Sequence, residues 1–330
     1  MTQPTPSTHP TDATHTTHPP HLTQIDAATT ARLMGPAAAV DVLAEVLRAG
    51  LDPEEGPARI SVRVPAGELL LMPAAFGRYA GVKIAGVAPG NAAAGLPRIT
   101  GSYLLLDGAN LRPLALLDGA ALTELRTPAV SALAVRHLTP TGRPLRLVLF
   151  GTGPQAYGHL EAVLAVRHVA EAIVVGRNQI GARALAGYAR TLGVLARTGT
   201  PDDVAEADLV VCCTTARTPL FDGALVAPGA TVVAVGSHEP DAREVDSALV
   251  ARSEVYVEAR SAALREAGDL LVPTAEGVIE EDHVRAGIAD LVTGRRTPTT
   301  ERPRFFKSVG MAWEDLAVAG ALYEAALAAP

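Results

Sequence analysis

From residue 145 onward, short and almost uninterrupted apolar runs alternate with stretches that have the apolar spacing of helices. The helical stretches include residues 154–169 and 179–191, and the apolar runs are RLVLFG, AIVVG, DLVVCCT, TVVAVG and EVYVE. Strands that are apolar on both faces are typical of parallel sheets covered by helices on both sides. The sequence therefore predicts an α/β domain of the dinucleotide-binding type, which we place at residues 141–302.

The first of these runs ends in a glycine motif. LVLFGTGPQA places Gly151-x-Gly153-x-x-Ala156 between a predicted strand and a predicted helix. In such a motif the first glycine permits a tight turn, the second lets a pyrophosphate approach the backbone, and the small third residue keeps helix and strand close. N–H groups at the helix start then face the phosphates. A turn that binds nothing is the alternative. The predicted cofactor contacts are Gly151, Gly153, Pro154, Gln155 and Ala156.

The second run ends in VVGRN, where an NAD-specific domain usually carries Asp or Glu to accept hydrogen bonds from the ribose hydroxyls. Arg177 occupies this place, Asn178 follows it, and no carboxylate is adjacent. The planar fork of an arginine can pair with the oxygens of a 2′-phosphate. We therefore predict that both residues contact the cofactor and that NADPH is favoured over NADH. A surface arginine in an arginine-rich chain is the competing interpretation.

The run ADLVVCCTTA carries both cysteines and two threonines. Neighbours in a strand point to opposite faces, so a disulfide between Cys212 and Cys213 would be strained. We expect reduced core thiols in a cytoplasmic protein. Thr214 and Thr215 follow at the carboxyl edge of the predicted sheet, where ligands of α/β proteins bind. They are predicted to contact the cofactor.

Residues 1–22 consist almost entirely of Thr, Pro, His and small polar residues. They cannot bury enough apolar surface to offset the entropy of ordering, so we expect a disordered tail. The tail offers no fixed geometry for a metal, although it holds four histidines, His9, His15, His18 and His21. The net charge of −7, without a basic block, argues against nucleic-acid binding. No apolar run is long enough to predict a membrane span, and no signal peptide is predicted.

The region between the tail and residue 140 begins with helical spacing at residues 37–49. Strand-like runs follow: RISVRV, ELLLM, GVKIAGV, YLLLD and PLALLD, the last two flanking the hairpin-length connection GANLR. A helical segment comes next, in which Thr127 and Pro128 resemble an N-cap and a first helical residue. A new helix is therefore predicted to begin there. Arg126 would then lie just ahead of a helix N-terminus, where an anion is favoured.

Lys83, in GVKIAGV, and Lys307 are the only lysines, whereas arginine is abundant. Burial can lower the pKa of a lysine enough for proton transfer, which arginine does not permit. We expect Lys83 at the end of a strand, where the alternative is a snorkelling surface lysine. Lys307 is expected to pair with a surface carboxylate. The segment around it predicts a short strand and a long helix that pack on the first domain.

Seven segments of the chain resemble the ornithine cyclodeaminase and mu-crystallin family. From about residue 25 onward they are LLLMPA, GVKIAGVAPGNAAAGLP, PLALLDGAALTELRTPAVSALA, GTGPQA, CTTARTPLFDG, VGSHEPDAREVD and FKSVGMAWEDLA, in the order of the family. The resemblance implies a homodimer with two domains per chain. A discontinuous substrate-binding and dimerisation domain (residues 23–140 plus 303–330) would accompany the Rossmann domain. Family activities all involve an amino-acid imine.

The resemblance also implies roles for single residues. Lys83 matches the active-site lysine of the family, and Arg126, in LTELRT, matches an arginine that binds the substrate carboxylate. Arg59, in PARISV, resembles a second such arginine. Guanidinium groups suit this task because they hold a small carboxylate with paired hydrogen bonds. The residues that the resemblance brings near the nicotinamide are Ser308, Val309 and Gly310.

Two positions depart from the cyclodeaminase pattern. His238, in VGSHEPDARE, replaces an aspartate that handles the substrate amino group. An imidazole cannot take this anionic part, although it can donate a proton to an imine. Arg98, in GLPRITG, stands where ornithine-specific members have a small hydroxyl residue. Both departures favour a reductase, and a simple loop role for His238 stays open.

The sequence thus predicts an NADPH-dependent reductase of small α-imino acids, with cyclic ketimines such as pyrroline-2-carboxylate or piperideine-2-carboxylate as type substrates. Arg59 and Arg126 would hold the carboxylate, while Lys83, alone or with His238, would manage the imine proton. The alternatives are an ornithine cyclodeaminase that retains NAD, an alanine or opine-type dehydrogenase, and a non-catalytic ligand-binding protein. The expected partners are a small imino or amino acid and a second copy of the chain, with no nucleic acid and no membrane.

Overall fold

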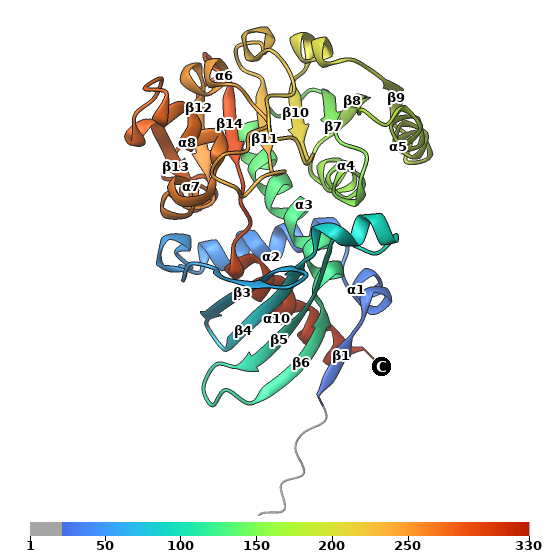
Figure 1. Cartoon of the computed structure of the whole chain (residues 1–330), viewed down its shortest axis with the longest axis vertical. Helices are drawn as coiled ribbons and strands as arrows, with labels where there is room; N and C mark the ends of the chain where they lie inside the picture. Colours follow the sequence, from blue (N-terminus) through green and yellow to red (C-terminus); the bar gives the residue numbers. More distant parts are fainter. Residues whose placement is uncertain (1–21, 330) are drawn as a thin grey trace, which may run out of the picture.

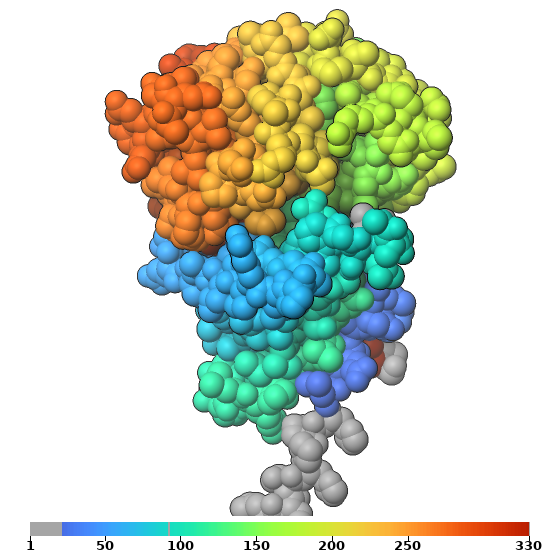
Figure 2. Space-filling view, viewed as in Figure 1, coloured from blue at the N-terminus to red at the C-terminus, as the bar shows by residue number. Residues whose placement is uncertain are grey.

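The structure, a computed structural model, describes residues 22–329, which form two sheets placed one above the other (Figure 1). The predicted tail and its four histidines therefore lie outside the described residues, apart from Leu22. In the space-filling view, light-blue and cyan segments of the lower half lie directly below yellow and orange segments of the upper half (Figure 2). Among the described residues, no helix is long and apolar enough to cross a bilayer.

The lower sheet has six strands in the order β1-β6-β5-β4-β3-β2. Strands β2 to β6 pair antiparallel with their neighbours, and β1 runs parallel to β6. Helix α10 contacts β3, β4 and β5, and it packs with α2 and α3. The elements are β1 (Thr23–Ile25), α1 (Ala27–Leu33), α2 (Pro36–Arg48), η1 (Pro53–Glu55), β2 (Ile60–Val64), β3 (Gly67–Phe76), β4 (Tyr79–Val87), η2 (Pro89–Ala94), β5 (Ile99–Asp107), β6 (Pro113–Asp118), α3 (Gly119–Leu138) and α10 (Ala312–Ala328).

The upper sheet has eight parallel strands in the order β13-β12-β14-β11-β10-β7-β8-β9. The two-domain α/β fold class is thereby confirmed. The elements are β7 (Leu145–Phe150), α4 (Pro154–Val166), β8 (Val169–Val175), α5 (Gln179–Thr191), β9 (Leu195–Thr198), η3 (Pro201–Glu206), β10 (Leu209–Cys212), η4 (Gly223–Leu225), β11 (Thr231–Ala234), α6 (Ser247–Arg252), β12 (Glu254–Val257), α7 (Arg260–Glu266), α8 (Gly268–Ala275), η5 (Glu281–His283), β13 (Val284–Gly287), α9 (Ile288–Val292) and β14 (Arg304–Lys307). The two cysteines at the end of β10 are free.

Strand β14 corrects the boundary at residue 303 that the sequence predicted. It inserts between β11 and β12 of the upper sheet, so only the chain after it returns to the lower half. Phe305 and Phe306 are fully buried, because β14 is paired on both edges and covered on both faces. The strand order explains the error: β14 comes last along the chain but lies inside the sheet.

Helix α3 is continuous, so the predicted helix start at Thr127–Pro128 is wrong. The cap is Asp118, whose Oδ1 accepts hydrogen bonds from the backbone N–H groups of Ala120 (2.9 Å) and Ala121 (3.0 Å). Pro128 cannot donate a helical hydrogen bond, but its ring packs against α4 at Gly158, where a Cβ would lie 2.8 Å from the proline Cγ. Tertiary packing of this kind offsets the lost bond.

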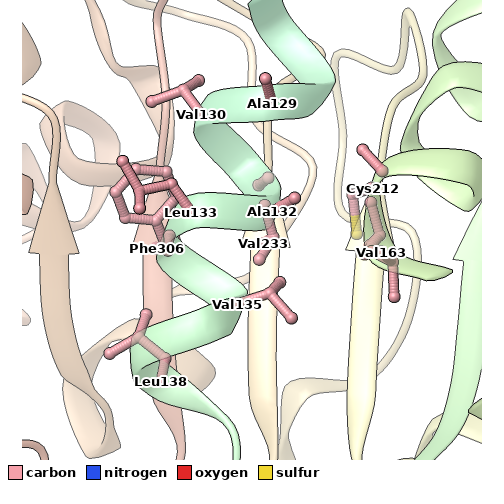
Figure 3. Close-up of a cluster of buried hydrophobic side chains, with 14 of the residues drawn as sticks. Ala129, Val130, Ala132, Leu133, Val135, Leu138, Val163, Cys212, Val233 and Phe306 are labelled. Carbon is pink, nitrogen blue, oxygen red and sulfur yellow. The ribbon is translucent and has the colours of Figure 1, made fainter. Parts of the chain in front are cut away.

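The carboxyl-terminal half of α3 runs along the upper sheet. Figure 3 shows Val130, Leu133 and Leu138 on the side of the helix that faces Phe306 of β14. All four side chains are buried in one apolar cluster. The amino-terminal half of the same helix packs on β4, β5 and α10 of the lower half. Arg126, near the middle of α3, therefore lies where the two halves meet rather than ahead of a helix N-terminus.

Candidate active site

Lys83 lies in the middle of β4, opposite Met72 of β3 and Tyr103 of β5. The expected strand-end position is therefore wrong, because β4 continues to Val87. The lysine is 3% exposed and points to the helix-covered face of the sheet, whereas its neighbour Ile84 is exposed on the other face. A snorkelling surface lysine is excluded by this burial.

The ammonium group of Lys83 has three protein contacts. It donates to Oδ1 of Asp315 at 2.9 Å, its Nζ lies 2.8 Å from Oδ2 of the same carboxylate, and Thr123 Oγ1 is 3.3 Å away. Burial lowers the pKa of Lys83 to about 8; Arg126 acts in the same direction and Asp315 opposes both. With a pKa in this range, Lys83 is mostly charged at neutral pH and loses its proton in the mildly alkaline range.

Arg126 shares Asp315 with the lysine. Its Nε donates to Oδ1 of Asp315 at 3.1 Å, and its Nη1 donates to Oε2 of Glu314 at 2.6 Å. Both carboxylates belong to the first turn of α10, where the helix dipole favours negative charge. The arginine is 5% exposed. Two of the predicted site cations are thus joined through one carboxylate.

Arg59 contacts the segment between β14 and α10. Its Nη2 donates to the carbonyl oxygens of Val309 and Gly310, each at 2.8 Å. Its Nε lies 2.8 Å from Oε2 of Glu266 in an ion pair. This half-buried arginine, from the loop before β2, therefore ties the lower half of the chain to the segment that leaves the upper sheet.

The segment Ser308–Gly310 is held from the other side by Glu258. This carboxylate accepts hydrogen bonds from Ser308 Oγ (2.6 Å), Val309 N (2.9 Å) and Gly310 N (3.0 Å). Gly310 has φ +75°, and a Cβ there would lie 2.7 Å from Nη1 of Arg126, so only glycine fits. The Ser308 hydroxyl is already bonded within the protein.

Four buried carboxyl groups thus surround three cations. Burial raises the pKa of Glu314 well above its usual range, and the neighbouring Glu258 acts in the same direction. The carboxyl groups are Asp315, Glu314, Glu258 and Glu266, and the cations are Lys83, Arg126 and Arg59.

The glycine motif borders a pocket of about 1030 Å³ at the carboxyl ends of β7, β8 and β10. Gly151 has φ +120°, and a Cβ would lie 2.6 Å from the carbonyl oxygen of Cys213. A Cβ on Gly153 would meet nothing within 4 Å, so this side of the turn is open. Pro154, Gln155 and Ala156 form the first turn of α4. The predicted residues that line the pocket are Gly151, Gly153, Arg177, Asn178, Thr214 and Thr215.

These features fit a dinucleotide. The volume has the size of a cofactor pocket, and α4 begins at its edge with backbone N–H groups that no helical carbonyl can accept. Gln155 Oε1 is buried without a hydrogen-bond partner among the described residues. Arg177 is exposed at the pocket and forms no ion pair within residues 22–329. Asn178 has a structural task as well, because its Oδ1 caps α5.

Thr214 has a more local role than expected. Thr214 lines the pocket, but its hydroxyl donates to Oε1 of Glu244 at 2.7 Å. His238, in the loop after β11, is half-buried. Burial lowers its pKa, and Arg59 acts in the same direction. The imidazole therefore holds a proton less readily than a histidine in water. Arg98 is exposed just before β5.

None of the four carboxylates of this cluster is among the site residues predicted from the sequence. One signal was present in MAWEDLAVAGALYEAALA, where Glu314 and Asp315 are adjacent and are followed by a run of seven apolar or small residues. Buried acids of this kind need cationic partners. Glu258 follows β12 at the carboxyl edge of the sheet, a position typical of functional residues in α/β folds. The described residues contain no group of three acidic, histidine or cysteine side chains that could hold a metal ion.

The chain is similar to known proteins over most of its length. Residues 31–329 match the ornithine cyclodeaminase/mu-crystallin family. The Delta(1)-pyrroline-2-carboxylate reductase of Bacillus thuringiensis subsp. konkukian is 38% identical over 253 residues, which cover 75% of this chain and 77% of that protein.

Solved structures extend the similarity to the fold. The Thermococcus litoralis Delta(1)-pyrroline-2-carboxylate reductase, in complex with NADH and L-proline, superimposes with a TM-score of 0.87 at 30% identity, covering 93% of this chain and 98% of that chain. An archaeal alanine dehydrogenase dimer with bound NAD also has a TM-score of 0.87, at 27% identity, with 93% and 96% covered. The resemblance noted in the sequence motifs is confirmed, and the chain belongs to the ornithine cyclodeaminase/mu-crystallin family.

Proposed function

We propose that the protein is a nicotinamide-dependent reductase of small cyclic α-imino acids of the pyrroline-2-carboxylate type. The observation that carries this proposal is the buried cluster of Lys83, Asp315 and Arg126, in which a titratable ammonium adjoins a guanidinium. An α-imino acid needs both, since its nitrogen takes a proton and its carboxylate needs orientation. The substrate class follows the reductase relatives.

Each residue of the cluster has a task in this reaction. Arg126 uses Nε and Nη1 for its two carboxylates, and no hydrogen bond within residues 22–329 uses Nη2, which can therefore bind the substrate carboxylate. Lys83 donates a proton to the imine nitrogen, and the protonated imine is the better electrophile. A bound reduced nicotinamide supplies the hydride that the imine carbon accepts. Arg59 is the second residue proposed to bind the substrate carboxylate, and His238 is a second candidate donor.

The proposed reaction is tested with preformed cyclic imines, with keto acids plus ammonia, and with ornithine, while oxidation of NADPH and of NADH is followed. We expect reduced cofactor to be consumed with cyclic imines and one amino acid to form per cofactor oxidised. Consumption that depends on ammonia and a keto acid would instead favour alanine dehydrogenase, in keeping with the similar structure. Ammonia release from ornithine with catalytic NAD would overturn the proposal in favour of a cyclodeaminase.

For the cofactor, we propose that NADPH is preferred and that Arg177 binds its 2′-phosphate. The support is an exposed guanidinium at the pocket, without an ion pair among the described residues, at the end of β8. We expect Arg177→Met to raise KM for NADPH about tenfold, because the variant loses the charge-assisted hydrogen bonds to the 2′-phosphate. KM for NADH, which has no 2′-phosphate, should stay within about twofold. Steady-state kinetics with both cofactors measure this. A parent enzyme that prefers NADH would contradict the assignment.

We also propose that the chain forms a homodimer through the uncovered face of the lower sheet. Exposed apolar side chains gather on this face, which α10 does not cover; they are Ile60, Val62 and Val64 of β2 and Ile84 of β4. A cluster of this kind marks an interaction surface. We expect light scattering to give the mass of a dimer for the parent.

We expect Ile84→Glu to shift the chain toward monomer, since it places a charge in the apolar contact. The matched control is Ile180→Glu, which changes an equally apolar exposed residue on α5 of the upper half. A monomeric parent, or the same mass for both variants, would contradict this interface.

A further inference from the structure

Lys307, the last residue of β14, is fully buried. Its Nζ donates to the carbonyl oxygen of Ser237 at 2.8 Å and lies 2.9 Å from Oδ2 of Asp269. Asp269 has no exposed surface, so the prediction that Lys307 pairs with a surface carboxylate is wrong. The second lysine of the chain is therefore as deeply buried as Lys83.

Asp269 also binds the loop before α6. It belongs to the first turn of α8, and its Oδ1 accepts hydrogen bonds from the backbone N–H groups of Glu244 (2.7 Å) and Val245 (3.0 Å). One carboxylate oxygen thus faces Lys307 and the other orients Glu244.

Glu244 joins two turns at the carboxyl edge of the sheet. Its Oε1 accepts from Thr214 N (2.8 Å) and Thr214 Oγ1 (2.7 Å), and its Oε2 accepts from Gly236 N (2.7 Å). The turns touch directly, because a Cβ on Gly236 would lie 2.1 Å from the carbonyl oxygen of Thr214. Since Ser237 follows Gly236 and binds Lys307, the contacts close into a ring.

The ring connects the ends of three adjacent strands, β10, β11 and β14. Its charged members, Lys307, Asp269 and Glu244, are at most 1% exposed. Removing charges from water costs several kcal/mol per ion, and apolar replacements are often as stable, so stability alone does not account for the ring. Both turns that it holds lie at the proposed site: one lines the cofactor pocket, and the other leads to His238.

We propose that Lys307, acting through Asp269 and Glu244, is a positioning residue that sets the Thr214–Thr215 turn and the His238 loop against each other for cofactor binding and hydride transfer. The part that concerns hydride transfer rests on the proposed reductase function. The part that concerns cofactor binding does not, because it can be measured without any substrate.

The experiment compares Lys307→Met with Arg304→Met. Arg304 lies at the other end of β14, is 3% exposed and donates to the carbonyl oxygen of Gly229, so both changes remove a buried cation from one strand. We expect Lys307→Met to weaken NADH and NADPH binding about tenfold or more, measured by nucleotide fluorescence titration, and to lower kcat for imine reduction. Arg304→Met should lower the melting temperature but bind both dinucleotides as the parent does.

Equal losses of dinucleotide affinity in the two variants, or parent-like affinity in Lys307→Met, would overturn the proposal. Either result would show that the ring contributes only to stability. If Lys307→Met does not fold, Lys307→Met/Asp269→Asn removes both charges together and is judged by the same criteria. Failure of this variant to fold would also overturn the positioning role. A parent that binds the dinucleotide but reduces no imine contradicts only the proposed reaction, and the affinity comparison still decides the role of Lys307.

Discussion

Lys83→Met is expected to lower kcat for imine reduction about 100- to 10,000-fold, the usual contribution of a positioned proton donor. Methionine matches the length of lysine but carries no proton, and the ammonium is the group that the structure holds against Asp315 with a pKa of about 8. Lys83 does not line the dinucleotide pocket, so affinity for the cofactor should stay within about twofold.

Lys83→Arg tests whether catalysis needs a proton that can be transferred or only a positive charge at this position. Arginine keeps a cation beside Asp315 but does not release a proton in proteins, so we expect this variant to be nearly as inactive as Lys83→Met. Activity within tenfold of the parent in either variant would show that the ammonium is not the proton donor.

The pH profile gives an independent measure of the same group. The active form of Lys83 is the ammonium, which loses its proton as the pH rises through about 8. We therefore expect kcat/KM of the parent to be level below this value and to fall tenfold per pH unit above it, because kcat/KM reports the free enzyme. The residual activity of Lys83→Met should lack this decline. A decline that persists in the variant would assign it to another group.

The second large effect is expected from Asp315→Asn, with a loss of about 3–5 kcal/mol in the free energy of unfolding. Asp315 is fully buried and is the shared partner of Lys83 and Arg126, so its neutralisation leaves two buried cations with one anionic neighbour fewer. The matched control is Glu324→Gln on the same helix, where the carboxylate pairs with Arg78 at the surface. An exposed pair contributes at most about 1 kcal/mol. Urea unfolding of both variants measures the difference.

Asp315→Asn should also move the pH profile. Asp315 raises the pKa of Lys83 against the effect of burial, so removing its charge lowers that pKa further below 8. The decline of kcat/KM should then begin at lower pH, and activity at pH 7 should fall. An unchanged profile, or a stability loss no greater than that of Glu324→Gln, would contradict the role assigned to this carboxylate.

The upper half of the fold was predictable because its signals are local. Continuous apolar strands and helical spacing indicate a parallel sheet wherever they alternate, and Gly151 and Gly153 mark the turn at the pocket from their own sequence context. The predictions that are wrong concern where an element lies in the three-dimensional fold. The sequence predicts the strand after residue 303 but not its place in the upper sheet. It predicts a helix start at Thr127–Pro128 because the packing of Pro128 against Gly158 involves a helix 30 residues further along the chain.

The candidate site divides in the same way. Local sequence patterns indicate the two-domain α/β class and the dinucleotide motif, and the family resemblance adds Lys83, Arg126 and Arg59 as predicted site cations. Which carboxylates contact these cations depends on the tertiary structure, because an ion pair such as Lys83–Asp315 joins residues 232 positions apart in the chain. The tertiary structure likewise decided that Lys307 is buried. The sequence gives the sign of each charged side chain. The partner and the pKa of that side chain depend on burial and distance, which arise only when the two halves pack together.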